Sequence, residues 1–167
     1  KPARSDSPTQ VVSYQGRDGT ALWGYLTVPA SAPATGAPMV VLPHGGPEAR
    51  DYYGYDPDVQ FLASRGYLVF QPQFRGSGGF GNRFAHAGRR QWGQAMQHDV
   101  TDGVQSLIQS GRVDARRICI VGTSYGGYAA LAGATLTPEL YRCAVSINGV
   151  GDLREMLRTE AIEGGRR

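Results

Sequence analysis

The stretch that decides the fold runs from Arg117 to Thr135 and reads RICIVGTSYGGYAALAGAT. Its first half is a short apolar run typical of a buried strand, and its alanine-rich second half is typical of a helix. Between them stands a Gly-x-Ser-x-Gly pattern, from Gly122 to Gly126. A serine on such a sharp strand-to-helix turn exposes its hydroxyl, and the helix N-terminus beneath it favours developing negative charge. The pattern therefore predicts a nucleophile at Ser124.

A second glycine-rich turn, HGGP at residues 44–47, directly follows the apolar run MVVLP. In strand-turn-helix nucleophile sites, the loop after this earlier strand supplies one backbone N–H to the oxyanion that forms during acyl transfer. The residue after the nucleophile supplies the other N–H, which here is that of Tyr125. We therefore expect the HGGP turn to lie beside Ser124 in the folded protein.

The rest of the chain alternates apolar strands with helical segments. Strands are expected at residues 39–43, 67–71, 117–122 and 143–149, and helices at residues 57–64 (with Asp56 as N-cap), 98–110, from Tyr125 onward and 153–163. Continuous apolar runs are typical of parallel strands that are covered on both faces. The order predicts an α/β fold with a mostly parallel sheet and helices on both sides.

The N-terminal part has a different pattern. Residues 11–28 alternate in polarity around a glycine-rich turn, which predicts an antiparallel hairpin with strands near Val11–Tyr14 and Ala21–Val28. We expect this hairpin at one edge of the sheet. Residues 1–10 are polar and contain two prolines, so they are expected to be a linker or a loose terminus. The domain is then expected over residues 11–167.

Composition excludes several classes of function. The chain has 167 residues, 24 of them glycine, with 41% hydrophobic residues and a net charge of +3. Its arginines form no basic stripe with interleaved aromatics, which argues against nucleic-acid binding. No apolar run reaches the roughly 18 residues that a membrane helix needs. Cys119 and Cys143 lie inside apolar runs and are expected to be two buried free thiols. Nothing in their spacing predicts a metal site, and no cofactor is expected.

Taken together, these segments resemble the catalytic domain of the prolyl oligopeptidase family of serine peptidases, and most closely its acylaminoacyl-peptidase and dipeptidyl-aminopeptidase branches. The resemblance runs from about Val11 to Leu153 in the order of the family. It is carried by RDGTALWGYLTVP (17–29), HGGP (44–47), FLASRGYLVFQPQFRGSGGFGNRFAHAG (61–88), QWGQAMQHDVTDGV (91–104), GTSYGGYAAL (122–131) and CAVSINGVGDL (143–153).

The resemblance implies an α/β-hydrolase fold and a role for particular residues. It implies a nucleophile at Ser124 and oxyanion donors at the N–H groups of Tyr125 and Gly46. Relatives with tyrosine at the position of His44 use its hydroxyl as a donor, so His44 is a weaker candidate than the backbone. Around Asn148 and Val150, relatives line the pocket for the residue before the scissile bond. Arg75, His98, Asp99 and Asp102 are expected to have structural roles, with Arg75 anchoring its glycine-rich loop.

A serine nucleophile also needs a base and a carboxylate that orients the base. In this fold both follow the serine in the chain. Only 43 residues follow Ser124, and all three histidines, His44, His86 and His98, precede it. The chain is therefore expected to be the front portion of a catalytic domain, inactive alone, and to self-associate or pair with the missing segments.

The substrate expected for the whole enzyme is a short peptide or an acyl-amino-acid amide. One alternative is a carboxylesterase or dienelactone-type hydrolase without a propeller domain. Another is a non-catalytic remnant that serves as an interaction module, against which the intact GTSYGG sequence argues. A cytoplasmic location is expected, with a periplasmic or secreted location as the alternative.

Overall fold

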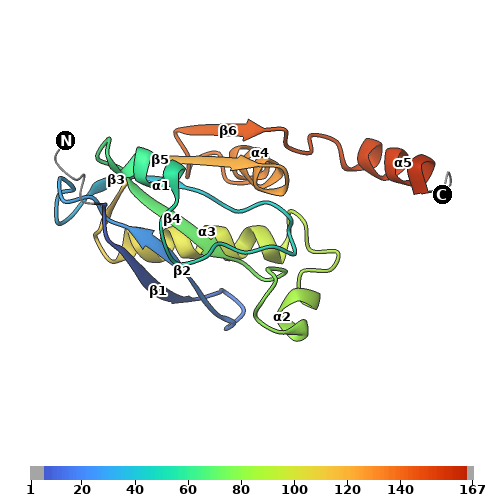
Figure 1. Cartoon of the computed structure of the whole chain (residues 1–167), viewed down its shortest axis with the longest axis horizontal. Coiled ribbons are helices and arrows are strands. Elements are labelled where there is room, and N and C mark those ends of the chain that lie inside the picture. Colours follow the sequence, from blue (N-terminus) through green and yellow to red (C-terminus); the bar gives the residue numbers. More distant parts are fainter. Residues whose placement is uncertain (1–5, 165–167) are drawn as a thin grey trace.

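A computed structural model describes residues 6–164 of the chain. Six strands form one sheet in the order β1-β2-β4-β3-β5-β6 (Figure 1). The strands are β1 (Thr9–Gln15), β2 (Ala21–Thr27), β3 (Ala37–Val41), β4 (Leu68–Gln73), β5 (Val113–Thr123) and β6 (Cys143–Ile147). Strands β4, β3, β5 and β6 are parallel to one another, and β1 and β2 form an antiparallel hairpin at one edge of the sheet. The predicted sheet is thus confirmed.

The helices are α1 (Pro57–Ala63), α2 (Asn82–His86), α3 (Ala95–Gln109), α4 (Tyr125–Leu136) and α5 (Leu153–Gly164). Four of the five were predicted, and the N-cap of α1 is confirmed because the Asp56 carboxylate accepts hydrogen bonds from the N–H groups of Asp58 and Val59. The short helix α2 was not predicted. It begins after Gly81, which has no side chain to cap it.

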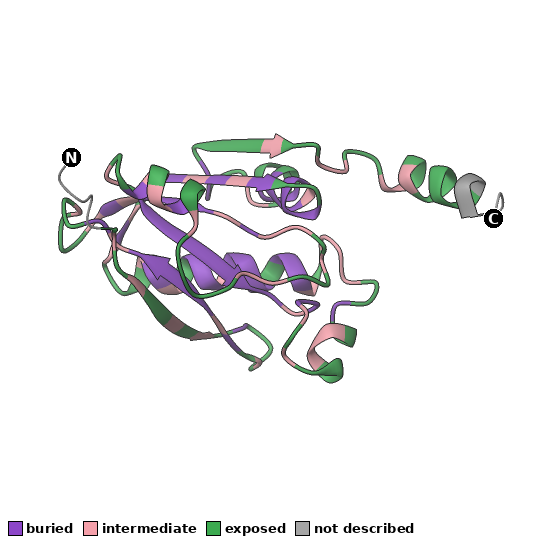
Figure 2. Ribbon diagram, in the orientation of Figure 1, coloured by how far each residue is buried: buried purple, intermediate pink, exposed green. Residues whose placement is uncertain are grey.

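The main core lies between one face of the sheet and helices α3 and α4. Alternate residues of a strand point to opposite faces, and β4 shows this directly. Leu68 and Phe70 belong to the main core, whereas Val69 packs with Val59 and Ala63 of α1 on the other face. Figure 2 shows that the central strands are buried, while β6 and the described part of α5 are largely exposed. Helix α5 extends away from the sheet beyond β6 (Figure 1).

The N-terminal segment is more ordered than its composition suggests. Strand β1 begins at Thr9, two residues inside the predicted linker. Before it, the backbone of Ser7 forms hydrogen bonds with the Gln60 side chain of α1 at both its N–H and its carbonyl. The part of the predicted linker within residues 6–10 therefore packs against the domain, and residues 1–5 lie outside the described residues.

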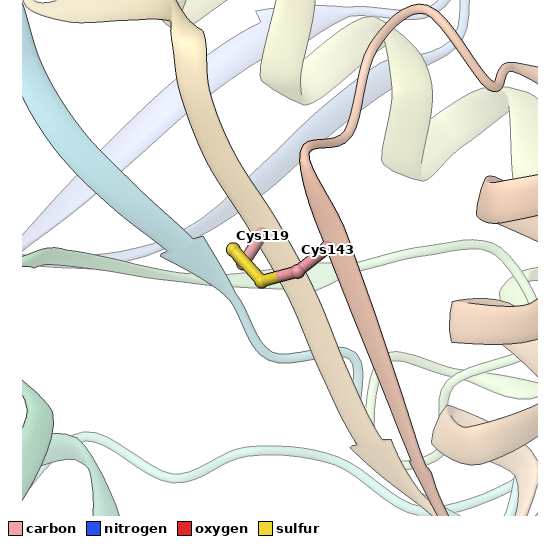
Figure 3. Close-up of a disulfide and its surroundings, with 2 residues drawn as sticks. All are labelled: Cys119 and Cys143. Atoms are coloured by element: carbon pink, nitrogen blue, oxygen red, sulfur yellow. A yellow bond between two sulfur atoms is a disulfide. The ribbon is translucent and has the colours of Figure 1, made fainter.

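The prediction of two buried free thiols was wrong. Cys119 of β5 and Cys143 of β6 form a disulfide (Figure 3). The two residues are directly opposite in the parallel register, with Cα atoms 4.7 Å apart, which lies within the range that a disulfide spans. Cys143 is exposed because β6 is an edge strand. Single-strand patterns predict neither the neighbour nor the register of a strand, so this pairing could not be read from the sequence.

Arg75 anchors the loop after β4, as predicted. Its backbone N–H and its guanidinium donate three hydrogen bonds of 2.7–2.9 Å to the carboxylate of Asp99, which is fully buried on α3. A fourth bond, of 2.7 Å, joins the guanidinium to Asp18 in the hairpin turn. Hydrogen bonding to these two carboxylates raises the pKa of Arg75. The cluster holds the hairpin, the loop and α3 together.

Replacing Asp99 with alanine is expected to lower the free energy of unfolding by about 3 kcal/mol, because it removes the buried partner and leaves the mostly buried Arg75 guanidinium with Asp18 alone. The matched control is Asp102→Ala, which breaks the pair with the half-exposed Arg17 and is expected to cost below about 1 kcal/mol. Urea unfolding of both variants measures the two losses. Equal losses would show that the Arg75–Asp99 pair contributes no more than a surface pair.

Candidate active site

Ser124 is the single residue between strand β5 and helix α4. Strand β5 ends at Thr123 and helix α4 begins at Tyr125. Ser124 has φ 58° and ψ −120°, in a region that L-residues rarely adopt, and its side chain is exposed. Its N–H donates to the carbonyl of Ile147 in the neighbouring strand, and its carbonyl accepts from the N–H of Tyr128. This left-handed serine at the strand-helix junction is the geometry of a nucleophile elbow.

Glycines make the turn sterically feasible. A Cβ at Gly122 would overlap the backbone of Gly126, and a Cβ at Gly126 would overlap the carbonyl of Pro43. Gly127 packs in the same way against Gly149, because a Cβ on Gly127 would lie 2.7 Å from the Gly149 Cα. Three chain segments thus meet around the serine at distances that only glycine allows.

The HGGP turn lies against Ser124, as expected from the sequence. A Cβ at Gly45 would lie 3.6 Å from the Cβ of Ser124 and 3.3 Å from the carbonyl of Thr123. Gly46 has φ 119°, a conformation that glycine adopts without strain. The turn therefore brings backbone N–H groups into the neighbourhood of the serine. The roles of the Gly46 and Tyr125 N–H groups as oxyanion donors stay predictions.

His44 is tied into the turn by both of its ring nitrogens. Nδ1 lies 2.7 Å from the Gly45 carbonyl, and Nε2 lies 2.8 Å from the hydroxyl of Ser77. The imidazole stacks on Phe74 with a centroid distance of 4.4 Å. Burial lowers the pKa of His44, which favours the neutral ring. With both nitrogens engaged, the contacts of His44 support the shape of the turn and favour the backbone groups as oxyanion donors.

The segment after β6 packs beside the elbow. Asn148 has φ 48° and an exposed side chain, and Val150 is half-buried. Gly149 between them contacts Gly127 in the first turn of α4. The structure thus brings the predicted substrate-pocket residues next to the turn that carries Ser124, and their contact with substrate stays a prediction. Asp152, which follows, accepts hydrogen bonds from two N–H groups at the start of α5 and so has a capping role.

Among residues 6–161, whose side chains the structure describes, no histidine or carboxylate forms a hydrogen bond with the Ser124 hydroxyl. His44 belongs to the turn described above, whereas His86 and His98 are exposed on α2 and α3. Arg75, Asp99 and Asp102 are held in ion pairs on α3 and its neighbours, consistent with the predicted structural roles. The described residues therefore place no base beside Ser124, and its role as the nucleophile stays a prediction.

The family model for the prolyl oligopeptidase family matches residues 53–164, which is more than half of the chain and includes the elbow. This chain belongs to the prolyl oligopeptidase family. It is 43% identical over 166 residues to dipeptidyl aminopeptidase BIII of Pseudoxanthomonas mexicana, with 95% of this chain and 24% of that protein covered. It is 33% identical over 147 residues to the human acylamino-acid-releasing enzyme, with 87% and 20% covered.

Solved structures of the family have the same fold. A puromycin-hydrolyzing peptidase of Mycobacterium tuberculosis matches with a TM-score of 0.85 at 30% identity, covering 91% of this chain and 24% of that one. An acylaminoacyl peptidase of Pyrococcus horikoshii matches with a TM-score of 0.81 at 28% identity, covering 89% and 24%. The α/β-hydrolase fold is thus confirmed, and the chain spans about a quarter of the length of these prolyl oligopeptidase relatives.

Two residues near the site were not singled out in the sequence. Trp92 packs against Tyr125, with ring centroids 4.6 Å apart. Asp51 lines a cavity of about 440 Å³ that also borders His44, Gly45 and Thr123. Burial raises the pKa of Asp51 to about 7. No sequence signal marks Asp51, because its environment depends on segments that are distant in the chain.

The His44 contacts predict a pH-dependent stability. Because burial lowers its pKa in the folded state, the stability that His44 contributes is present above about pH 6.5 and is lost as pH falls below that value. We expect His44→Gln to cost about 1 kcal/mol at pH 7.5, and less at pH 5. Urea unfolding at the two pH values measures the difference in the free energy of unfolding between the wild type and the variant. The control is His98→Gln, at an exposed position. If His44→Gln costs more free energy of unfolding at pH 5 than at pH 7.5, the lowered pKa of His44 in the folded state is contradicted.

Proposed function

We propose that this chain is the nucleophile-bearing portion of a serine peptidase that cleaves short peptides or acyl-amino-acid amides through an acyl-enzyme on Ser124. The observation that carries the proposal is the left-handed Ser124 at the junction of β5 and α4, with the HGGP turn packed against it. The names of its relatives, a dipeptidyl aminopeptidase and an acylamino-acid-releasing enzyme, support the substrate class.

In the proposed reaction, the Ser124 Oγ attacks the carbonyl carbon of the substrate, and a base takes the hydroxyl proton. The carbonyl oxygen becomes an oxyanion that accepts hydrogen bonds from the N–H groups of Gly46 and Tyr125. The C–N bond then breaks, the amine leaves with that proton, and water hydrolyses the acyl-enzyme. The base and its orienting carboxylate come from residues beyond this chain.

The dependence on further residues makes the chain inactive alone in this proposal. Strand β6 is an edge strand, and its apolar side chains Val145 and Ile147 are 45% and 47% exposed. Exposed apolar side chains on an unpaired edge support pairing of β6 with further segments of the protein. Self-association of the chain through the same edge is the alternative partner prediction. Within residues 6–164, no helix has the length and apolar character required to cross a membrane.

The location of the protein stays a prediction. The Cys119–Cys143 disulfide supports the periplasmic or secreted alternative over the cytoplasmic one, because disulfides persist mainly in oxidising compartments. Alkylation of thiols in freshly lysed cells, followed by mass spectrometry of the two cysteine peptides, distinguishes the locations. Unmodified, linked peptides favour the oxidising compartment, and alkylated peptides favour the cytoplasm.

The activity is tested on the longer protein that contains this chain. Matched substrates with one acyl group and either an anilide or an ester leaving group are hydrolysed, and kcat/KM is compared for both. A peptidase cleaves the anilide and short peptides, whereas ester cleavage alone would favour the carboxylesterase alternative. The 167-residue chain is expected to cleave neither substrate above background, and turnover by it would overturn the proposed need for further residues.

A further inference from the structure

A second cavity, of about 470 Å³, lies on another side of the HGGP turn. One wall is formed by Gly46 and Pro47 of the turn together with the next residue, Glu48. The other is formed by four residues that follow α2: Gly88, Arg89, Arg90 and Trp92. The Trp92 ring packs against Tyr125, the residue that follows the nucleophile. The cavity therefore borders Gly46, one predicted oxyanion donor, and is separated from Tyr125, the other, by the Trp92 ring. Its volume is within the range of small-molecule sites.

The wall after α2 is held by close backbone contacts. Gly88 packs against Gly76 so closely that a Cβ at either position would meet the other backbone. The Gly76 N–H also donates to the Phe84 carbonyl in α2, at 3.0 Å. Arg90 has φ 57°, a left-handed conformation that is unusual for arginine. These backbone contacts therefore fix the positions at the rim of the cavity from which the side chains of Arg89 and Arg90 extend.

The rim carries uncompensated positive charge. Arg89 and Arg90 are exposed, and neither forms an ion pair within the described residues. Glu48 is the single carboxylate among the residues that line the cavity. By contrast, Arg17 and Arg75 elsewhere in the fold have carboxylate partners. Two guanidinium groups at the rim therefore have hydrogen-bonding capacity left for a ligand.

We propose that this cavity is a substrate subsite that binds a carboxylate through Arg89 and Arg90. The inference rests on the proposed function and refines its substrate class to peptides with an acidic side chain, or a free C-terminal carboxylate, close to the scissile bond. Arginine suits this role because its planar guanidinium donates two parallel hydrogen bonds to a carboxylate. The apolar ring of Trp92 forms the wall along which the attached carbon chain lies.

The test uses the longer protein and two sets of peptides. In the first set, each of the two residues on either side of the scissile bond is in turn Glu or the isosteric Gln, with an amidated C-terminus. In the second set, a Gln peptide ends two residues after the scissile bond as a carboxylate or as an amide. The variant is Arg89→Gln/Arg90→Asn, in which asparagine is chosen because it tolerates left-handed backbone. Arg83→Gln, on exposed α2 and away from the cavity lining, is the control.

We expect kcat/KM of the wild type to favour the carboxylate member of a pair at one position by about tenfold, as for one charged hydrogen bond. The double variant loses this preference and keeps its rate on the neutral member, and Arg83→Gln retains both. If no pair shows a preference, or if the double variant keeps it, the subsite is overturned. If the neutral peptides are not cleaved by the wild type, the proposed function itself fails.

Discussion

Replacing Ser124 with alanine in the longer protein is expected to lower kcat for short peptides by at least about 10⁴-fold. In the proposed reaction the hydroxyl of Ser124 supplies the atom that becomes acylated, and alanine has no hydroxyl to replace it. Hydrolysis of peptides is followed by chromatography of the products. Ser13→Ala, on the exposed side of β1, is the matched control and is expected to leave kcat unchanged.

Stability provides a second readout at the same position. Ser124 is held at φ 58°, where residues with a Cβ are strained and glycine is not. Ser124→Gly is therefore expected to raise the free energy of unfolding by about 1 kcal/mol while abolishing activity. Ser124→Ala keeps the Cβ and is expected to leave stability nearly unchanged. A Ser124→Gly variant less stable than Ser124→Ala would contradict the presence of strain at the elbow.

The second large effect is expected at Gly126. A Cβ added to Gly126 would occupy the place of the Pro43 carbonyl oxygen. Pro43 belongs to the segment that leads into the HGGP turn. Gly126→Ala must push that backbone away, which is expected to cost about 3 kcal/mol or more in the free energy of unfolding. Because Gly45 contacts Ser124 from the same segment, the displacement is also expected to lower kcat in the longer protein.

The control for Gly126→Ala is Gly151→Ala. Gly151 has open space where a Cβ would be added and no left-handed backbone, so this variant is expected to unfold at nearly the same urea concentration as the wild type. Both variants are compared by urea unfolding. If Gly126→Ala is as stable as Gly151→Ala, the close approach between α4 and the HGGP turn does not exist in solution.

The parts of the fold that depend on local pattern could be predicted. The apolar run before Ser124 and the alanine-rich run after it determine a strand and a helix, and the glycines between them determine the turn. The Asp56-Pro57 pair marks the start of α1 for the same local reason. Each of these features involves residues that are neighbours in the chain.

The parts that depend on distant residues could not be predicted. The disulfide required knowing that Cys119 and Cys143 are opposite in register, and β-pairing register is not encoded in either strand alone. His44 meets Ser77 across 33 residues of chain, and this contact gives the ring its supporting role. Helix α2 follows the left-handed Gly81 without a capping side chain, so no start signal marked it.

Labelling with a fluorophosphonate probe tests the central claim most directly, because the probe reacts with an activated serine nucleophile. The longer protein is treated with the probe, digested, and analysed by mass spectrometry. We predict that the modified peptide carries the probe on Ser124 and that Ser124→Ala abolishes both labelling and peptide hydrolysis. A probe attached to another serine, or hydrolysis that persists in Ser124→Ala, would contradict the assignment of Ser124 as the nucleophile.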